Sequence, residues 1–484
     1  MNSIIELVSK QAQMHPDQLC IIDKKAAHTY LDTWKRAVYI AQVFSEMNIG
    51  IGNCVIVECT QDFEFLVCKL SCELTGAIFV PIEYQSSPEK VQMILEETDA
   101  LLLICDTRYE LPIAQINYES LFARKVKDPE RTFPFPAKET TAEILYTTGT
   151  MGKPKGVELT NGNNVALAEN IKYGTEMKSN NIELIPLPLS HSHGLRSFYA
   201  NVLNGSAVVI CNGVTHVKQI FEWVRQYQIS AMDLSPSAVA VLISLTKNKF
   251  FDLNEQLDYI QIGTAALEEN TKKQLLDGFP DVRLYNFYGS TESGRTAVLE
   301  FSKERNRCRC IGKPSVHAEF IITDEEHKAV SSSAENPGLI ASAGAMNMKG
   351  YWKHPELTEQ IMQNGFIYSN DLGYVDQEGF IYIIGRKDDV INCGGLKIAP
   401  EEIEECAKQY EGILDCACIP TEDKILGQVP KLYLVVQQQE KFQYKEFIQY
   451  LKRVIDKNRL PREIEFVEKI PRTYNGKIQR KKLI

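Results

Sequence analysis

The sequence is that of a long, mildly acidic chain. Its 484 residues exceed what one hydrophobic core usually holds, so we expect at least two domains. Apolar residues make up 44% and charged residues 24%, which is ordinary for a globular protein. The net charge of −10 disfavours non-specific nucleic-acid binding, which needs a broad basic surface. A small phosphorylated ligand remains compatible with it, because a few local cations and backbone amides suffice.

The sequence also bears on cellular location. No apolar run approaches the roughly 18 residues that cross a bilayer, so no membrane insertion is expected. The N-terminal segment lacks the basic start and apolar stretch of a signal peptide. Thirteen cysteines are scattered through apolar segments, which is typical of reduced thiols, and the pairs Cys308–Cys310 and Cys416–Cys418 lack the spacing of a zinc site. We therefore expect a cytoplasmic protein.

Short apolar runs suited to strands recur along the first four fifths of the chain. Helical patterns lie between several of them, as in residues 88–100, where Val91, Ile94 and Leu95 fall on one face. Continuous apolar strands alternating with helices predict sheets covered on both sides. This part is expected to be a large α/β domain with β-sheets flanked by helices. The predicted strands are 54–59, 77–82, 100–105, 207–211 and 259–263.

The pattern changes between residues 366 and 400, where short aromatic strands alternate with glycine and acidic turns. Pro400, followed by two glutamates, has the composition of a helix start. A strand is predicted at 431–436, a helix near 447–455 and a strand at 463–467. These elements suffice for a small, mobile C-terminal α/β domain.

The domain boundary is predicted within the charged segment GRKDD, through which no apolar periodicity runs. It divides the chain into an N-terminal domain of residues 1–387 and a C-terminal domain of residues 388–484. Two α/β units of unequal size are therefore expected.

The segment YTTGTMGKPKG, residues 146–156, has the composition of an anion-binding loop. Glycines let backbone amides approach an anion, threonine hydroxyls add donors or a magnesium ligand, and lysines supply charge. The segment is neither a Walker A loop, because proline follows Lys153, nor a G-x-G-x-x-G fingerprint. Its composition predicts a phosphate-binding loop of another type.

Five further motifs follow this loop. They are Y-G-S-T-E at 288–292, S-N-D at 369–371, G-R-K-D-D at 385–389, a glycine loop with an acidic helix start at 394–404, and P-R-T-Y-N-G-K at 471–477. Together the six resemble the adenylate-forming superfamily of acyl- and aryl-CoA synthetases, peptide-synthetase adenylation domains and firefly luciferase. The match runs in the family's order over nearly the whole chain and looks most like the acid–CoA ligases.

The resemblance implies an ATP-dependent acid–thiol ligase. A carboxylate would attack the α-phosphate of ATP to give an acyl-adenylate and pyrophosphate, and a thiol would then displace AMP. The acceptor expected from this resemblance is CoA; the alternative is the phosphopantetheine arm of an acyl or aryl carrier protein.

The resemblance also places the phosphates of ATP and its Mg²⁺. Glu292 would bind Mg²⁺ with Thr148, because a hard cation takes oxygen ligands beside phosphates. Thr291 would donate to the α-phosphate during catalysis. The phosphate-binding residues would be Thr147, Thr148, Gly149, Thr150, Gly152, Lys153, Lys155 and Gly156.

Adenosine would be held by three other segments. Tyr288, next to Gly289, would lie against the adenine, and Asp371 would accept hydrogen bonds from the ribose with the assistance of Arg386. The family's adenine-side segment corresponds to Gly263, Thr264 and Ala265.

The family's second step depends on domain rotation. Lys477 would first reach from the C-terminal domain to bridge the attacking carboxylate and the α-phosphate, as a flexible ammonium group can. Rotation about Asp388 would then withdraw Lys477 and bring Gly394, Gly395 and Lys397 to the acyl-adenylate. Glycines there leave room for a pantetheine arm.

The sequence gives only partial information on the carboxylic acid substrate. Residues 188–196, PLSHSHGLR, resemble the segment of acyl- and aryl-CoA synthetases in which a histidine lies near the carboxylate, and His191 takes that place as a catalytic residue. His191-Ser192 replaces the Phe-Asp pair that holds an α-amino group in peptide synthetases, so an amino acid is disfavoured, although D-alanine ligases keep it open. Arg196 and Arg295 could pair with a second carboxylate, as in succinylbenzoate-type ligases, or with acids of the protein.

Three positions depart from the family pattern. Met151 replaces a hydroxyl of the phosphate loop, Ser190 replaces phenylalanine, and Asn370 replaces glycine, whose left-handed backbone asparagine tolerates. Hypotheses from other functional classes are a luciferase-type oxygenase, a non-catalytic nucleotide-binding module and an ADP-releasing kinase.

The expected partners are a small carboxylic acid and either CoA or a carrier protein, and no nucleic acid is expected to bind. The protein is expected to be a monomer or a homodimer.

Overall fold

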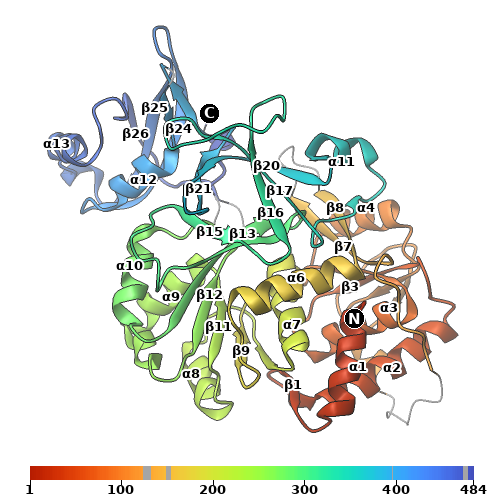
Figure 1. Ribbon diagram of the computed structural model, residues 1–484. Coiled ribbons are helices and arrows are strands. Elements are labelled where there is room, and N and C mark those ends of the chain that lie inside the picture. The colour runs from red at the N-terminus through yellow and green to blue at the C-terminus, as the bar shows by residue number, and fades with distance from the viewer. Residues whose placement is uncertain (124–131, 149–153, 395, 473–477, 484) are drawn as a thin grey trace.

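The computed structural model describes residues 1–123, 132–148, 154–394, 396–472 and 478–483 (Figure 1). These residues form three β-sheets with helices packed against them, in a large N-terminal part and a small C-terminal part. In Figure 1 the small part, in blue, lies above the large part at the upper left. The predicted fold class, a large α/β domain followed by a small one, is confirmed.

The largest sheet holds the strands that lead to the nucleotide motifs. Its central strands, β10, β9, β11, β12 and β13, run parallel. The predicted strands at 207–211 and 259–263 are β10 and β12, and both are buried throughout, as parallel strands covered on both faces should be. In spatial order this sheet contains β16 (Ala318–Thr323), β17 (Gly338–Gly344), β20 (Phe366–Val375), β21 (Ile381–Arg386), β15 (Cys310–Pro314), β14 (Gly294–Glu300), β13 (Arg283–Ser290), β12 (Tyr259–Ile262), β11 (Ala231–Leu234), β9 (Ile182–Ile185), β10 (Ala207–Ile210), β1 (Leu19–Ile22) and β2 (Ala27–Thr29), with β19 (Met362–Gln363) beside β20.

The second sheet contains the hairpin that carries the phosphate-loop motif. β7 and β8 pair antiparallel, with Thr147 opposite Lys155 and Tyr146 opposite Gly156. The predicted strands at 54–59, 77–82 and 100–105 are β3, β4 and a shorter β5. In spatial order the sheet contains β18 (Gly350–Tyr351), β8 (Pro154–Thr160), β7 (Thr141–Thr148), β4 (Ile78–Ile82), β3 (Cys54–Glu58), β5 (Leu102–Ile104) and β6 (Ala114–Ile116).

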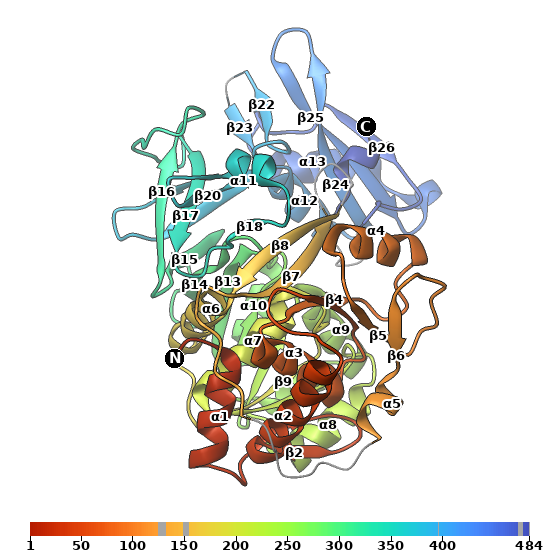
Figure 2. The ribbon, with the colours of Figure 1, turned by 90° about the vertical axis from the view of Figure 1, so that its right-hand side faces the viewer.

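The third sheet forms the centre of the small C-terminal part. The predicted helix start at Pro400 is confirmed, and Glu401 and Glu402 lie in the first turn of that helix, α12. The elements predicted at 431–436, 447–455 and 463–467 are β25, α13 and β26. The order is β23 (Leu396–Ile398), β22 (Ile391–Cys393), β25 (Gly427–Val436) and β24 (Ile413–Asp423), with β26 (Glu463–Phe466) beside β25. Figure 2 shows the β22–β23 hairpin in the upper part of this domain, above α12.

The two parts of the chain meet through a short connection and two ion pairs. β21 ends at Arg386 and β22 begins at Ile391, so the predicted boundary between residues 387 and 388 falls in the connecting segment and stays a prediction. Lys408 Nζ of α12 lies 2.6 Å from Glu268 Oε1, and Arg309 Nη2 lies 3.6 Å from Glu405 Oε2. These contacts hold α12 against the large part.

Several helices begin at a residue whose side chain caps the first turn. Ser87 accepts a hydrogen bond from the Lys90 amide at the start of α4, and Pro88 takes the first helical position. Val91 and Ile94 are buried beneath this helix, as its pattern predicts. The helices are α1 (Ile4–Met14), α2 (Tyr30–Glu46), α3 (Phe63–Thr75), α4 (Pro88–Thr98), α5 (Tyr118–Phe122), α6 (Asn161–Gly174), α7 (Ser192–Asn204), α8 (Val217–Gln226), α9 (Pro236–Thr246), α10 (Glu269–Gly278), α11 (Pro355–Ile361), α12 (Pro400–Lys408) and α13 (Tyr444–Val454), with 3₁₀ turns η1 (Lys249–Leu253), η2 (Gln439–Lys441) and η3 (Arg480–Lys482).

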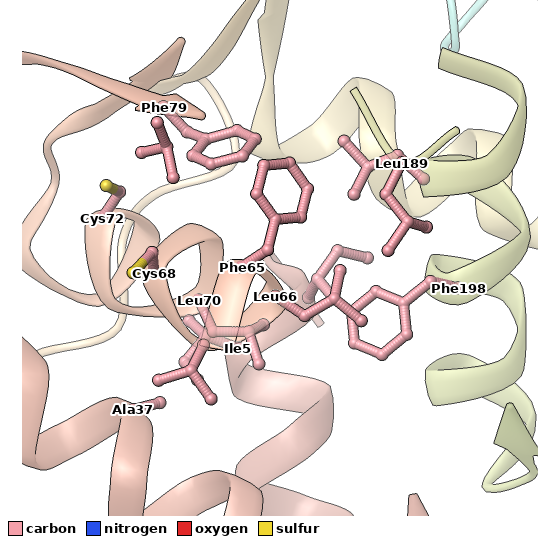
Figure 3. Packing of buried hydrophobic residues seen from close by; sticks show 14 of the residues in the cluster. Ile5, Ala37, Phe65, Leu66, Cys68, Leu70, Cys72, Phe79, Leu189 and Phe198 are labelled. Carbon is pink, nitrogen blue, oxygen red and sulfur yellow. The ribbon is translucent and has the colours of Figure 1, made fainter. Parts of the chain in front are cut away.

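The core of the large part packs α3 against α7 and β4. Figure 3 shows Phe65 of α3 between Phe79 of β4 and Phe198 of α7, with Leu189 beside them. The Phe65 and Phe79 rings meet edge to face with 5.4 Å between their centroids, a favourable aromatic geometry. This packing fixes helix α7, which begins at Ser192 within the PLSHSHGLR segment. Among the helices of the described residues, none is long and apolar enough to cross a membrane.

Candidate active site

The predicted site residues follow the carboxyl ends of neighbouring parallel strands. β9 ends at Ile185, shortly before His191, and β12 ends at Ile262, directly before Gly263. β13 ends within the Tyr288–Glu292 motif. In sheets of this kind, ligands bind outside the carboxyl ends of the strands. The fold therefore gathers three separate motifs at one edge of the largest sheet.

An aromatic side chain links the phosphate-loop hairpin to the expected metal ligand. The Tyr351 hydroxyl donates to Glu292 Oε1 at 2.9 Å, and Lys155 Nζ lies 5.0 Å from the centre of the Tyr351 ring. Tyr351 is placed there because β18 pairs with β8. Burial, followed by the charge of Glu292, raises the pKa of Tyr351 well above its usual value. A carboxylate oriented by a hydroxyl donor beside a lysine suits a Mg²⁺–phosphate group.

The segment that begins α7 touches the same motif. Ser192 Oγ lies 3.1 Å from Thr291 Oγ1, within hydrogen-bonding distance. His191 precedes Ser192, and its Nε2 lies 3.0 Å from Glu83 Oε1. His191, together with Lys90, lowers the pKa of Glu83 to about 2, so this carboxylate is charged at neutral pH. The structure thus places His191 next in sequence to the Ser192–Thr291 contact, with its ring against Glu83.

The residues expected at the adenine and the ribose are joined directly. The Tyr288 hydroxyl donates to Asp371 Oδ2, and Arg386 Nε lies 3.4 Å from Asp371 Oδ1. Asp371 and Arg386 are opposite each other on β20 and β21. Asn370 has φ of 61°, which confirms that asparagine adopts the left-handed backbone there. Tyr288 therefore orients the carboxylate predicted to bind the ribose.

Two glycines of the site are required by close packing. A Cβ on Gly289 would lie 1.8 Å from the carbonyl oxygen of Gly294, and one on Gly263 would lie 2.4 Å from Cε1 of His193. His193 in turn has its Nε2 2.8 Å from Asp233 Oδ1. Thr264 has φ of 76°, an unusual conformation for a β-branched residue and one that clusters at binding sites.

The contact between Gly263 and His193 gives a stability prediction. Gly263→Ala is expected to lower the free energy of unfolding by about 1–3 kcal/mol, because the added methyl must displace the partly buried imidazole of His193. Urea unfolding followed by circular dichroism measures the change. Gly50→Ala is the matched control, since its Cβ would meet nothing closer than 3.9 Å. Equal losses in the two variants would contradict the packing assigned to Gly263.

The structure contradicts the idea that Arg196 and Arg295 face a second carboxylate of the substrate. Arg295 is buried, and its Nη2 lies 3.1 Å from Asp233 Oδ2. Arg196 is also buried and donates to the carbonyl oxygens of Ser290 and Thr291. Both guanidinium groups bind the protein itself, because the apolar surroundings force a buried cation to find internal partners.

Several predicted residues lie outside the described part of the chain or away from the site. Asp388 accepts a hydrogen bond from Asn370 Nδ2 at 3.0 Å in the segment between the sheets. Gly394 and Lys397 are exposed on the β22–β23 hairpin, at the edge of the third sheet. In the described residues no hydrogen bond or ion pair joins this hairpin to the Tyr288–Glu292 motif. Outside the described residues lie Gly149, Thr150, Gly152, Lys153, Gly395 and Lys477, and the side chain of Thr148.

Two residues of the site escaped the sequence reasoning. Tyr351 belongs to none of the six motifs, and its role follows from the pairing of β18 with β8. His193 lies in the PLSHSHGLR segment, but only the fold brings it to Asp233 and Gly263. The sequence around a tyrosine or a histidine does not indicate which residues, far away in the chain, it will contact in the fold.

Comparisons with known proteins agree with this arrangement. A family model described as AMP-binding enzyme matches residues 8–352, and one described as AMP-binding enzyme C-terminal domain matches residues 402–477. The 2-succinylbenzoate–CoA ligase of Bacillus subtilis is 26% identical over 487 residues, covering 98% of this chain and 96% of that protein. The peroxisomal OPC-8:0-CoA ligase 1 of Arabidopsis thaliana is 25% identical over 504 residues, covering 98% of this chain and 91% of that protein.

Two solved structures share the fold. The o-succinylbenzoate CoA synthetase (MenE) from Bacillus subtilis, in complex with the acyl-adenylate intermediate OSB-AMP, superposes with a TM-score of 0.86 at 24% identity, covering 99% of this chain and 97% of that one. ATP-bound MatB from Rhodopseudomonas palustris gives a TM-score of 0.88 at 20% identity, covering 100% and 98%. The family models span most of the sequence, and the chain therefore belongs to the AMP-binding enzyme family.

Proposed function

We propose that this chain is an AMP-forming acid–CoA ligase. It activates a carboxylic acid as an acyl-adenylate with release of pyrophosphate and then transfers the acyl group to the thiol of CoA. The observation that carries the proposal is the contact chain from Lys155 through Tyr351 to Glu292, beside the Tyr288–Asp371 hydrogen bond. It offers a cation, a metal ligand and a ribose acceptor in a chain that belongs to the family along its length.

The first half-reaction brings two anions together, so it needs positive charge and fixed donors. Mg²⁺, when bound, neutralises charge on the phosphates of ATP. Glu292 would hold that ion, and Lys155 would bind the phosphates at the base of the β7–β8 hairpin. Thr291 would donate to the α-phosphate, and Lys477 would bridge that phosphate and the attacking carboxylate.

The names of the relatives favour CoA as the acceptor. Those of Bacillus subtilis and Arabidopsis thaliana are both called CoA ligases, and they align with nearly all of this chain. Transfer to the phosphopantetheine arm of a carrier protein remains the alternative.

A cytoplasmic location is part of the proposal, and it is supported by the thirteen free cysteines, most of which are buried. We also propose that the protein is a monomer or a homodimer.

A panel of acids tests the proposal. Aryl, fatty, dicarboxylic and amino acids are each supplied with ATP and Mg²⁺, and pyrophosphate release is followed with CoA, with a phosphopantetheinylated carrier protein, or with neither. Acid-dependent AMP and pyrophosphate with a CoA thioester as product is the expected result. Thioester on the carrier alone would select the alternative, and ADP as product would refute both.

The second half-reaction has its own prediction. Gly395→Trp is expected to leave acyl-adenylate formation intact and to slow thioester formation by roughly a hundredfold or more, because an indole fills the path of the pantetheine arm. Mass spectrometry of both products separates the two steps. Ile425→Trp, at a 90% exposed position of the same domain, is the control. Loss of adenylate formation in the Gly395 variant would overturn the assignment of the glycine loop.

A further inference from the structure

Arg196 binds the backbone of the motif that carries Thr291 and Glu292. It lies in the second turn of α7 and is only 3% exposed. Its Nη1 donates to the carbonyl oxygen of Ser290 at 2.9 Å, and its Nη2 donates to that of Thr291 at 2.7 Å. The rigid, planar guanidinium presents two donors at once and therefore fixes two successive peptide groups.

Other contacts hold the same motif from different sides. The Glu292 carbonyl oxygen accepts from the Met348 amide at 2.7 Å, and its carboxylate accepts from Tyr351. Ser192, in the first turn of α7, reaches Thr291 through their hydroxyls. Arg196 is the member of this set that holds the peptide groups directly before Glu292, so the direction of that side chain depends on it.

The helix that carries Arg196 also contacts a buried carboxyl group on the phosphate-loop strand. Burial lowers the pKa of Arg196 to about 10, and Glu143 is the first group to oppose the shift. Glu143 is fully buried on β7, the strand that leads into the phosphate loop, and it accepts from the Tyr199 hydroxyl at 2.5 Å. Since α7 contributes both Arg196 and Tyr199, the helix connects the phosphate-loop strand with the metal-ligand motif.

The charge of Glu143 is balanced from α3 as well. Burial raises the pKa of this carboxyl, and Lys69 is the first group to oppose the shift. Lys69 is fully buried, pairs with Glu73 and lies 4.6 Å from the centre of the Tyr199 ring. The charges around Arg196 therefore form an internal network that needs no contact with the substrate.

We propose that Arg196 is a positioning residue of the ATP site: it fixes the peptide groups from which Thr291 and Glu292 project, on a helix that the Tyr199–Glu143 hydrogen bond ties to the phosphate-loop strand. The inference rests on the proposed function for the roles of Thr291 and Glu292. It predicts that substitution of Arg196 raises the Mg²⁺ concentration needed for ATP binding, because fewer contacts then hold Glu292.

The test measures ATP binding by calorimetry at a series of Mg²⁺ concentrations, with no acid and no CoA. Arg196→Lys keeps the charge but not the planar pair of donors, and it is expected to raise the Mg²⁺ concentration for half-maximal binding by roughly ten- to a hundredfold. Glu143→Gln keeps the shape of the side chain and removes its charge, and a shift of several-fold in the same direction is expected. Melting temperatures are recorded for each variant.

Arg283→Lys is the matched control. Arg283 donates to the carbonyl oxygens of Thr175 and Glu176 and pairs with Asp258, at the opposite end of β13. Its replacement should lower the melting temperature and leave the Mg²⁺ dependence unchanged. If Arg196→Lys and Glu143→Gln change only the melting temperature, the positioning role is refuted. Because binding is measured without acid, a failure of ligase activity would not be mistaken for a failure of this role.

Discussion

Replacing Lys477 with alanine is expected to abolish acyl-adenylate formation while leaving the conversion of supplied acyl-adenylate into thioester intact. The first step brings two anions together, and loss of the bridging ammonium group should slow it by roughly a thousandfold or more. In the proposed mechanism the second step does not use Lys477, which would have withdrawn by then. Rapid-quench measurements of acyl-AMP and of thioester, each started from its own substrate, give the two rates.

The residues on either side of this segment make contacts within the small C-terminal part. Arg472 and Ile478 form a β-bridge on either side of residues 473–477, which lie outside the described residues. Arg480 lies 2.5 Å from Glu404, and Arg472 lies 2.7 Å from Asp415. Both ends of the segment are thus tied to the body of the small domain.

Lys481→Ala is the control for Lys477→Ala, because Lys481 is an exposed lysine four residues further along. It should leave both steps near the wild-type rates. Equal losses of the two steps in the Lys477 variant would contradict a role limited to adenylate formation.

Glu292→Gln is expected to have the second-largest effect. The amide keeps the size of the side chain and can still accept from the Tyr351 hydroxyl, so the main loss is the negative charge offered to Mg²⁺. We expect adenylate formation to fall by roughly a hundred- to a thousandfold and the Mg²⁺ requirement to rise. Pyrophosphate release measured over a Mg²⁺ titration tests this.

Glu300→Gln provides the comparison, since Glu300 lies at the other end of β14 and pairs with Lys303 at 2.7 Å. This variant should keep the wild-type Mg²⁺ dependence. A Glu292 variant with the same dependence as the wild type would remove Glu292 from the metal site.

Much of the fold could be predicted because many of its strands have a recognisable apolar pattern in the sequence. The runs at 54–59, 77–82, 207–211 and 259–263 are almost entirely apolar, as expected for strands buried on both faces. By contrast β24 (Ile413–Asp423) escaped prediction, because both of its ends are partly exposed and carry polar residues, which leaves only four buried residues, CACI, at its centre. The order of the strands in the sheets also could not be read from local patterns, since it depends on contacts between distant segments.

The candidate site was predictable in its motifs and less so in its contacts. Thr291 and Asp371 stand in recognisable sequences, and the structure adds their contacts with Ser192 and Tyr288. The roles of these residues stay predictions. Arg196 and Arg295 show the opposite case. Their charge was visible in the sequence, but only the fold reveals that they bind the Ser290–Thr291 backbone and Asp233 instead of a ligand.

The central claim is that an organic acid attacks the α-phosphate of ATP in this protein. Supplying an accepted acid with both carboxylate oxygens as ¹⁸O tests it most directly, because the oxygen that forms the bond to phosphorus leaves with AMP when the thiol attacks the acyl carbon. The account predicts one ¹⁸O atom in each AMP released and none in pyrophosphate. Unlabelled AMP, or label found in inorganic phosphate together with ADP, would contradict it.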